Sequence, residues 1–296
     1  MPTLKETKGR IASVRNTLKI TSAMKLVASA KLRKAQQAIE AMRPYERQLQ
    51  AILAAASPKY AKIMDAKPLE ESASTFSAQN RDKGPVAIVA VSSNSSLCGS
   101  FNTNVMAKVR SVRRPGDIVY SVGRKMAEAM RREGFPSPED YSALAERPAY
   151  SPAAALVEHL MEEYEKGRVK GVLLVYNHFI STAKQVPVVE WLLGAPEPSG
   201  EEDSTAAAAE PLAPDTIIEP GRKELLEELL PKTLKLKFYA ALLDSAAAEH
   251  SARTVAMQTA TDNAENLLDE LTLQYNKGRQ QKITAEILDL AGGQKD

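Results

Sequence analysis

The stretch SARTVAMQTATDNAENLL, residues 251–268, has the composition of a helix but lacks the large apolar side chains that usually anchor a helix in a core. It contains neither Gly nor Pro, and between Asp244 and Asn266 the only large apolar residues are Val255 and Met257. Alanine recurs instead at every fourth position, at Ala248, Ala252, Ala256, Ala260 and Ala264. Because a row of small side chains lets a partner helix approach closely, this stretch predicts a thin, tightly paired helix.

The residues on both sides of this stretch also favour a helix. Between Pro231 and Leu290 only Gly278 departs from it, which predicts a helix of about 60 residues and ~90 Å. We expect Pro231 to interrupt a shorter helix that starts near Gly221 and to begin the long one, because a first helical turn tolerates the missing N–H of Pro. The predicted seam comprises Leu243, Met257, Ala260, Ala264, Leu267, Leu271 and Tyr275, followed by Ile283, Ile287 and Leu290.

The N-terminal segment predicts a second long helix. From Leu4 to Ser57 the chain has one Gly, Gly9, and one interior Pro, Pro44, where a kink would fall. Apolar residues recur at steps of three, four or seven, which is the spacing of a seam on an amphipathic helix, here roughly 80 Å long. This seam comprises Ile11, Val14, Leu18, Met24, Val27, Ala35, Ile39, Met42, Leu49 and Leu53.

The segment between the two helices has the pattern of a separate domain. Short apolar runs rich in β-branched residues predict strands at 86–93, 117–123, 169–179 and 184–193. Helical segments separate the first three strands, and we expect Ser151 to cap and Gly167 to close the last of these helices, 152–168. Strands that alternate with helices predict a small α/β domain with a largely parallel sheet.

These observations predict an antiparallel coiled coil of the two terminal helices with the α/β domain inserted between them. Because alanine buries far less area than leucine, the pair has a weak seam. Two interpretations stay open, a coiled coil surrounded by a partner and a free-standing one. The predicted parts are an N-terminal coiled-coil helix at 1–57, a connector at 58–85, the α/β domain at 86–193, an acidic, Pro-rich linker at 194–220 and the C-terminal helices at 221–296.

The net charge of +2 conceals an uneven distribution. Residues 1–50 carry eleven Lys or Arg against three Glu, whereas residues 194–220 carry seven Asp or Glu and no Lys or Arg. The basic helix is open to three interpretations: a solvated face, a nucleic-acid-binding surface, or a rod facing acidic loops of a partner protein. Nucleic-acid binding would depend steeply on salt. A mitochondrial transit peptide is not favoured, because the helical stripe continues unchanged past residue 35.

The residues that carry chemistry form no catalytic constellation. The turn NSSLCGS at 94–100 follows a strand, but the chain has no G-x-S-x-G, G-x-G-x-x-G or phosphate-binding Gly-rich motif. We interpret Cys98 as a small buried thiol and not as a nucleophile. Because it is the single cysteine of the chain, an internal disulfide is excluded. The three histidines show no metal-ligand spacing, so we expect neither metal nor cofactor. No apolar run reaches the ~18 residues of a membrane span, so membrane association is expected to be indirect.

Three segments resemble the gamma subunits of F-type ATP synthases. They are RIASVRNTLKITSAMKLVASAKLRKAQ at 10–36, SSLCGSFN at 95–102 and AEHSARTVAMQTATDNAENLLDELTLQYNKGRQQKITAEILDL at 248–290. The resemblance covers nearly the whole chain. It implies a Rossmann-like middle domain and a non-catalytic central stalk, whose rotation inside a hexamer of alpha and beta subunits couples proton flow to ATP synthesis at the beta sites.

The resemblance also implies partners and contact residues. The partners are the alpha and beta subunits, the epsilon subunit and the membrane rotor ring, on the cytoplasmic face of a bacterial inner membrane. Met24 and Lys25, in ITSAMK, match positions beside the acidic lever loop of beta. Arg253 matches a basic position of the C-terminal helix. The upper contact with beta matches Arg279, Gln280 and Thr284.

Two features depart from the family pattern. Many members carry a basic residue and a glycine before LCG, whereas this chain has Ser95 and Ser96. The acidic segment 196–215 has no family role. Two alternatives from other classes remain open, a coiled-coil scaffold or nucleic-acid-binding protein that uses the basic helix, and a small α/β enzyme with Cys98 at its centre.

Overall fold

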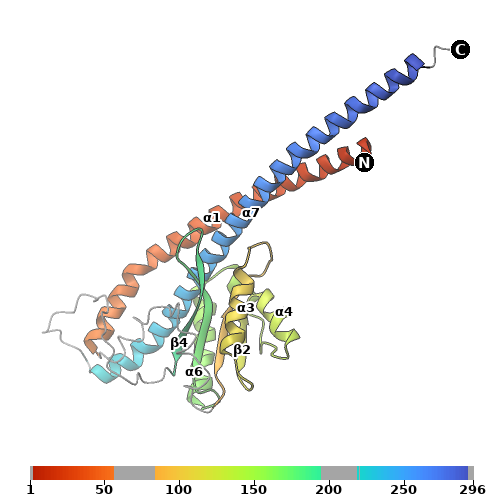
Figure 1. The fold of residues 1–296 in the computed structure, drawn as a ribbon. Coiled ribbons are helices and arrows are strands. Elements are labelled where there is room, and N and C mark those ends of the chain that lie inside the picture. The colour runs from red at the N-terminus through yellow and green to blue at the C-terminus, as the bar shows by residue number, and fades with distance from the viewer. Residues whose placement is uncertain (1–2, 57–83, 195–218, 220, 293–296) are drawn as a thin grey trace, which may run out of the picture. The chain divides into compact units, whose positions relative to one another are not determined.

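The computed structural model describes the chain over residues 3–56, 84–194, 219 and 221–292. The predicted connector and linker, 58–85 and 194–220, lie almost wholly outside the described residues. The chain divides into two compact units. We call Met1–Ser29 with Arg253–Asp296 the coiled-coil unit, and Ala30–Ala252 the middle unit. Helix α1 (Leu4–Ala56) and helix α7 (Arg222–Gly292) each contribute to both units (Figure 1).

In the coiled-coil unit, α1 and α7 pair in antiparallel orientation. A Cβ on Gly278 would lie 3.3 Å from Cδ2 of Leu4. Further along α1, Thr261 Oγ1 donates to Thr21 Oγ1 at 3.0 Å, and Lys25 Nζ donates to Gln258 Oε1 at 2.6 Å. The partner numbers fall along α7 as the numbers rise along α1. The predicted antiparallel coiled coil is therefore confirmed.

The seam of the coiled-coil unit follows a strict heptad pattern. One row of buried or half-buried residues on each helix is spaced alternately by four and three, and half-buried residues such as Met24 and Ala260 lie beside it. A mean spacing of 3.5 predicts a left-handed supercoil. The two rows are Thr7, Ile11, Val14, Leu18, Thr21, Lys25 and Ala28 on α1, and Met257, Thr261, Ala264, Leu268, Leu271, Tyr275 and Gly278 on α7.

Parts of the predicted seam are wrong. Val27 is 57% exposed and Leu267 is 39% exposed, because the heptad repeat places Ala28 and Ala264 in the seam and turns the larger side chains outward. Every residue from 281 to 290 is exposed, including Ile283, Ile287 and Leu290. Gly278 already lies opposite Leu4 at the start of α1, so no α1 residue remains to cover the last turns of α7.

The predicted helix break at Pro231 is wrong, and the predicted kink at Pro44 stays a prediction. Pro231 lies inside α7, and Pro44 lies inside α1. A Pro in a helix removes one backbone hydrogen bond. The burial of Leu234, Leu236 and Phe238 in the turns that follow Pro231 offsets this loss, so a single helix forms where we expected two.

The sheet of the middle unit has the strand order β2-β1-β3-β4. Strand β1 (Ala87–Val91) is parallel to β2 (Ile118–Val122) and to β3 (Val172–Phe179). Strand β4 (Gln185–Leu193) is antiparallel to β3. The prediction of a largely parallel sheet holds for three strands. Because only a short turn joins β3 to β4, the chain has no room for the crossover that a parallel pair needs.

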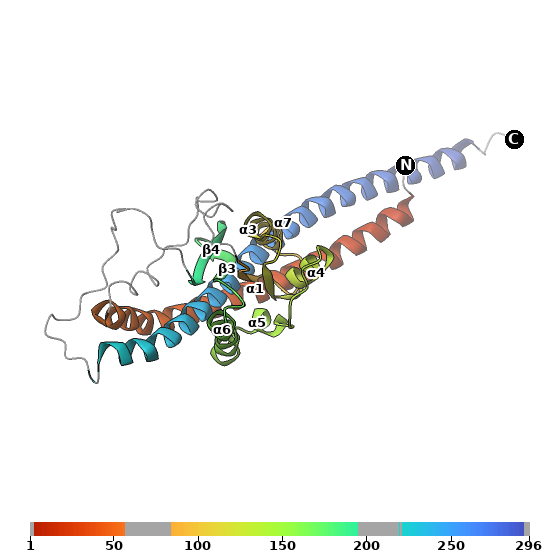
Figure 2. The same ribbon diagram turned by 90° about the horizontal axis from the view of Figure 1, so that it is seen from below.

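Helices cover both faces of this sheet (Figure 2). Helices α3 (Phe101–Val112) and α4 (Arg124–Arg132) pack on one face with Ile88 and Ala90, while α5 (Ser142–Glu146) and α6 (Tyr150–Glu165) pack on the other with Val89. The second face is completed by α7 through Leu234, Phe238, Ala241 and Leu242. The middle unit therefore has three layers, and part of α7 belongs to its core.

Two further local predictions for the middle unit are corrected. Helix α6 begins at Tyr150 after Ala149, with no side-chain cap, because Ser151 already lies within the helix; α5 was not foreseen. The first two alanines of the row, Ala248 and Ala252, were expected to face the N-terminal helix, and this is also corrected. Ala248 and Ala252 pack against Cys98 and Phe101 of the α/β domain.

Candidate functional site

The residues predicted to contact a partner differ in how the structure places them. Met24 and Lys25 are half-buried, and Arg253 is buried. Arg279, Gln280 and Thr284 are exposed on the last turns of α7, beyond the start of α1. Thr284 Oγ1 donates to the carbonyl of Gln280 at 3.0 Å, so these two lie one turn apart on a single helix face. That these residues contact a partner stays a prediction.

Lys25 belongs to a chain of hydrogen bonds between α1 and α7. Its Nζ donates to Oε1 of Gln258, and Nε2 of Gln258 donates to Oδ1 of Asp262 at 2.6 Å. A lysine at a seam position carries its charge to the edge of the helix pair while its stem covers the apolar interior. The structure therefore fixes the direction of this ammonium group, which the sequence did not show.

Sequence reasoning missed an apolar surface on the coiled-coil unit. Large apolar residues of both helices are exposed, and Leu290 reaches 78% exposure. Several large apolar side chains exposed on one helix pair favour a site of contact with another macromolecule. The only signal in the sequence was a surplus of apolar residues beyond those that the heptad seam uses. The set comprises Ile20, Leu26 and Val27 on α1 and Val255, Leu267, Leu273, Ile283, Ile287, Leu288 and Leu290 on α7.

The turn between β1 and α3 holds its cysteine in the interior. Cys98 is buried, and Nδ2 of Asn102 donates to its Sγ at 3.3 Å. Ser93 Oγ donates to the carbonyl of Ser95, which ties the turn to itself. Leu97, in contrast, has φ +67° and is exposed. A left-handed conformation is uncommon at a leucine, so the turn holds Leu97 in a strained, exposed position.

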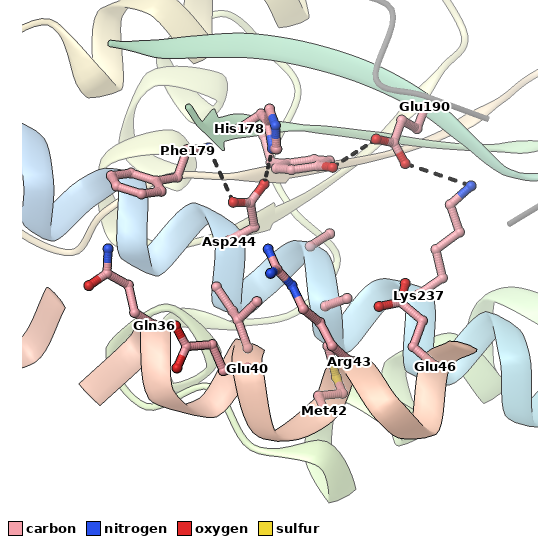
Figure 3. A pocket seen from close by; sticks show the side chains of 14 residues that line it. Gln36, Glu40, Met42, Arg43, Glu46, His178, Phe179, Glu190, Lys237 and Asp244 are labelled. Carbon is pink, nitrogen blue, oxygen red and sulfur yellow. Dashed lines mark hydrogen bonds and ion pairs between the residues drawn. The ribbon is translucent and has the colours of Figure 1, made fainter. Parts of the chain in front are cut away.

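A cavity of about 470 Å³ lies within the middle unit between α1, the β3–β4 hairpin and α7 (Figure 3). The cavity contains a buried polar network. Tyr176 Oη donates to Glu190 Oε1 at 2.7 Å, and Lys237 Nζ lies 3.6 Å from Glu190 Oε2. On the same wall His178 Nδ1 lies 2.5 Å from Asp244 Oδ2. These five side chains are all paired, and they join β3, β4 and α7 within the middle unit.

Burial shifts the ionisation of this network. Desolvation lowers the pKa of Lys237, with Glu190 opposing the shift, and desolvation raises the pKa of Tyr176. The pKa of Glu46, which faces the network from α1, is raised by burial and lowered to a smaller extent by Arg43, Arg47 and Lys237. Burial therefore explains the direction of all three shifts, and neighbouring charges oppose it at Lys237 and Glu46.

Neither a metal centre nor a membrane span is found in the part of the chain that the structure describes. No three His, Cys, Asp or Glu side chains there are arranged to hold a metal ion. None of the described helices has an apolar stretch that could cross a bilayer.

Comparison with known proteins places the chain in a family. A family model described as ATP synthase matches residues 3–295. The ATP synthase gamma chain of Phocaeicola vulgatus is 47% identical over 302 residues, which cover 99% of both chains. The ATP synthase gamma chain of Heliobacterium modesticaldum is 36% identical and covers 99% of this chain and 98% of its own length.

Solved structures share the fold. The chain is similar to one from the rotor of the Euglena gracilis mitochondrial ATP synthase, with a TM-score of 0.63, 17% identity and coverage of 95% and 98%. A chain from the central stalk and c-ring of the Tetrahymena thermophila mitochondrial ATP synthase matches with a TM-score of 0.54 and 21% identity, over 81% of this chain and 99% of its own. Relatives at 36–47% identity and a family model across the whole length agree. The chain therefore belongs to the ATP synthase gamma chain family, the central-stalk subunits of F-type ATP synthases.

Proposed function

We propose that the coiled-coil unit is the shaft that turns inside a hexamer of alpha and beta subunits, and that the bond-making chemistry of ATP synthesis belongs to the beta subunits. The observation that carries this proposal is the apolar surface of Ile20, Leu26 and Val27 on α1 and of the last turns of α7. A coiled coil that worked alone in solvent would bury these side chains or replace them with polar ones.

The thin seam supports a shaft in a narrow bore. Thr21, Ala28 and Ala264 bring the helix axes close together, and Gly278 leaves Leu4 just enough room. Replacing these residues with leucine would widen the pair. Small seam residues therefore give up apolar burial within the pair, and contact with the surrounding hexamer supplies the burial that the seam lacks.

We assign the contacts with beta to residues of both helices, which range from exposed near the tip of α7 to buried at Arg253. Lys25, held by Gln258, and Met24 face the acidic lever loop of beta. Arg279, Gln280 and Thr284 contact beta near the tip of α7, and Arg253 contributes positive charge on the same helix. Attraction between a basic rod and acidic loops has a long range and needs no fixed pairing, so one rod serves several equivalent neighbours in turn.

The middle unit contacts the remaining rotor parts in this proposal. Its partners are the epsilon subunit and the membrane rotor ring, and the complex lies on the cytoplasmic face of a bacterial inner membrane. Membrane association is then indirect and depends on the ring.

Reconstitution with matched alpha and beta subunits tests the proposal. We expect this chain to assemble with them and to stimulate ATP hydrolysis. Arg279→Glu reverses the charge on an exposed turn of α7, so we expect weaker assembly and slower hydrolysis because the beta loops are acidic. The matched control is Arg131→Glu, which reverses an exposed charge on α4.

Size-exclusion chromatography and steady-state hydrolysis measure both effects. The proposal is contradicted if the chain stays outside the hexamer. The assignment of Arg279 is contradicted if Arg279→Glu and Arg131→Glu behave alike.

A further inference from the structure

Three polar side chains lie at seven-residue intervals on α7 and face the β3–β4 hairpin. They are Lys237, Asp244 and Ser251, and we call them the clamp row. Residues seven apart lie on nearly the same face of a helix, about 10.5 Å from each other along its axis. All three and all their partners belong to the middle unit.

Asp244 is the central member of the clamp row and binds the end of β3 (Figure 3). Its Oδ2 lies 2.5 Å from His178 Nδ1, and its Oδ1 accepts the backbone N–H of Phe179 at 3.1 Å. Both carboxylate oxygens are used, and they hold two successive residues of one strand. A carboxylate bound at both oxygens defines a direction as well as a distance.

Lys237 binds β4 from the same face of α7. Its Nζ donates to the carbonyl of Trp191 at 3.3 Å and lies 3.6 Å from Glu190 Oε2. The other oxygen of Glu190 accepts from Tyr176 on β3. Lysine, glutamate and tyrosine are all buried, so breaking this network would leave a charge without a partner in the interior.

Ser251 forms hydrogen bonds with the turn between the two strands and with the start of β4. Its Oγ donates to the carbonyl of Thr182 at 2.8 Å and accepts from Nε2 of Gln185 at 3.2 Å. Ser251 is fully buried. The clamp row therefore holds the hairpin at β4, at the end of β3 and at the turn.

Apolar packing alone does not provide this kind of attachment. Leu234, Phe238 and Leu242 bury α7 against the sheet, but the hydrophobic effect is non-directional and resists separation more than rotation or sliding. Hydrogen bonds and ion pairs require alignment, so three of them spread along the helix fix its angular setting.

We propose that the clamp row is the torque coupling of this subunit, because it holds the β3–β4 hairpin and residues 222–252 of α7 in one angular setting. Lys237, Asp244 and Ser251 are positioning residues in this proposal, because each of them acts by holding the hairpin. The inference rests on the proposed shaft function. Helix α7 runs from Arg222 to Gly292, so the helix that carries the clamp row also contributes to the coiled-coil unit.

The test uses the complex reconstituted with alpha, beta and the remaining rotor and membrane subunits. Two conservative variants weaken the clamp row while preserving packing. Ser251→Ala removes the contacts at the turn. Lys237→Met combined with Glu190→Gln removes the buried ion pair, while the Gln carbonyl still accepts from Tyr176. The matched control is Lys232→Met, a lysine of α7 whose ion pair is with Glu228 of its own helix.

The readouts are the angular fluctuation of a probe on the middle unit and the protons pumped per ATP hydrolysed. If the three contacts add as equal parallel restraints, losing one lowers the torsional stiffness by up to about one third. We expect broader fluctuations and a lower pumping ratio in both clamp variants, with hydrolysis retained, and no change in Lys232→Met.

Two results overturn different claims. Unchanged fluctuations and an unchanged pumping ratio in both clamp variants would overturn the torque coupling while leaving the shaft intact. A wild-type complex whose probe does not rotate with ATP would instead overturn the proposed function on which the coupling rests.

Discussion

At the scale of single residues, burial decides how the ionisable groups of the middle unit behave. Lys237 is buried with its charge balanced by Glu190, whereas Glu46 faces the same network from α1 and, within the described residues, forms no ion pair or hydrogen bond. Burial penalises the charged form of a group, so the two receive opposite pKa shifts: the pKa of Lys237 falls and that of Glu46 rises. The charged form of Glu46 therefore lowers the free energy of unfolding.

Glu46→Gln should stabilise the chain at neutral pH. A raised pKa in the folded state means that the folded chain binds the proton more tightly, so the stability contribution is present at low pH and is lost as pH rises through the folded pKa. The glutamine variant should therefore gain free energy of unfolding at pH 7 and match the wild type near pH 4. Urea unfolding at both values measures this difference.

The control for this substitution is Glu40→Gln, on an exposed position of the same helix. We expect no stability change from it at either pH. A Glu46→Gln variant that was less stable than the wild type at pH 7 would show that the carboxylate makes a favourable contact with Lys237, Arg43 or Arg47 that outweighs its burial.

At the scale of elements, the helix pair depends on small side chains at fixed heptad positions. Ala264 is buried in the seam, and Thr21 and Thr261 meet across it through their hydroxyl groups. Thr21 also donates to the carbonyl of Leu18, and the single hydroxyl proton of Thr261 is shared between Thr21 and the carbonyl of Met257, so neither hydroxyl is left unpaired. Polar and small seam residues fix the register of a coiled coil at some cost in stability.

Ala264→Leu should destabilise the coiled-coil unit. The added side chain overpacks a seam built for close approach, at an expected cost of about 1–3 kcal/mol. The matched control is Ala285→Leu, on an exposed turn of α7, which should be nearly neutral. Thermal unfolding followed by circular dichroism compares the two. Equal stability of both variants would contradict the close approach of α1 and α7 at Ala264.

Much of this element structure could be predicted from the sequence. Alanine spacing, the absence of helix breakers and the alternation of strands with helices led to the antiparallel pair and to the α/β domain. The exact seam could not be predicted, because the sequence offers more apolar residues than one heptad stripe uses. Val27 and Leu267 were therefore assigned to the interior, whereas the smaller Ala28 and Ala264 lie there.

The errors at Pro231 and β4 have a different origin. Local rules favour a helix break at Pro231, but tertiary burial of Leu234 and Phe238 overrides the lost hydrogen bond. The clamp row escaped notice because its members, Lys237, Asp244 and Ser251, are ordinary polar residues whose partners lie about 46 to 69 positions away in sequence. Such pairings depend on tertiary contacts that periodicity does not reveal.

At the scale of the whole molecule, the two units share α1 and α7, and this continuity connects the apolar surface of the coiled-coil unit with the clamp row of the middle unit. A subunit that converts rotation into changes at distant sites needs an asymmetric contact surface and a firm attachment to the part that is driven. The chain offers the first at the outer faces of α1 and α7 and the second at the β3–β4 hairpin.

The most direct test of the shaft is to watch the middle unit turn. Arg131→Cys on α4 gives an exposed thiol for a probe, while the native Cys98 is buried. With the hexamer fixed to a surface, we predict that the probe rotates in one direction when ATP is added and stops when ATP is exhausted. A probe that stays still while the assembled hexamer hydrolyses ATP would contradict the account.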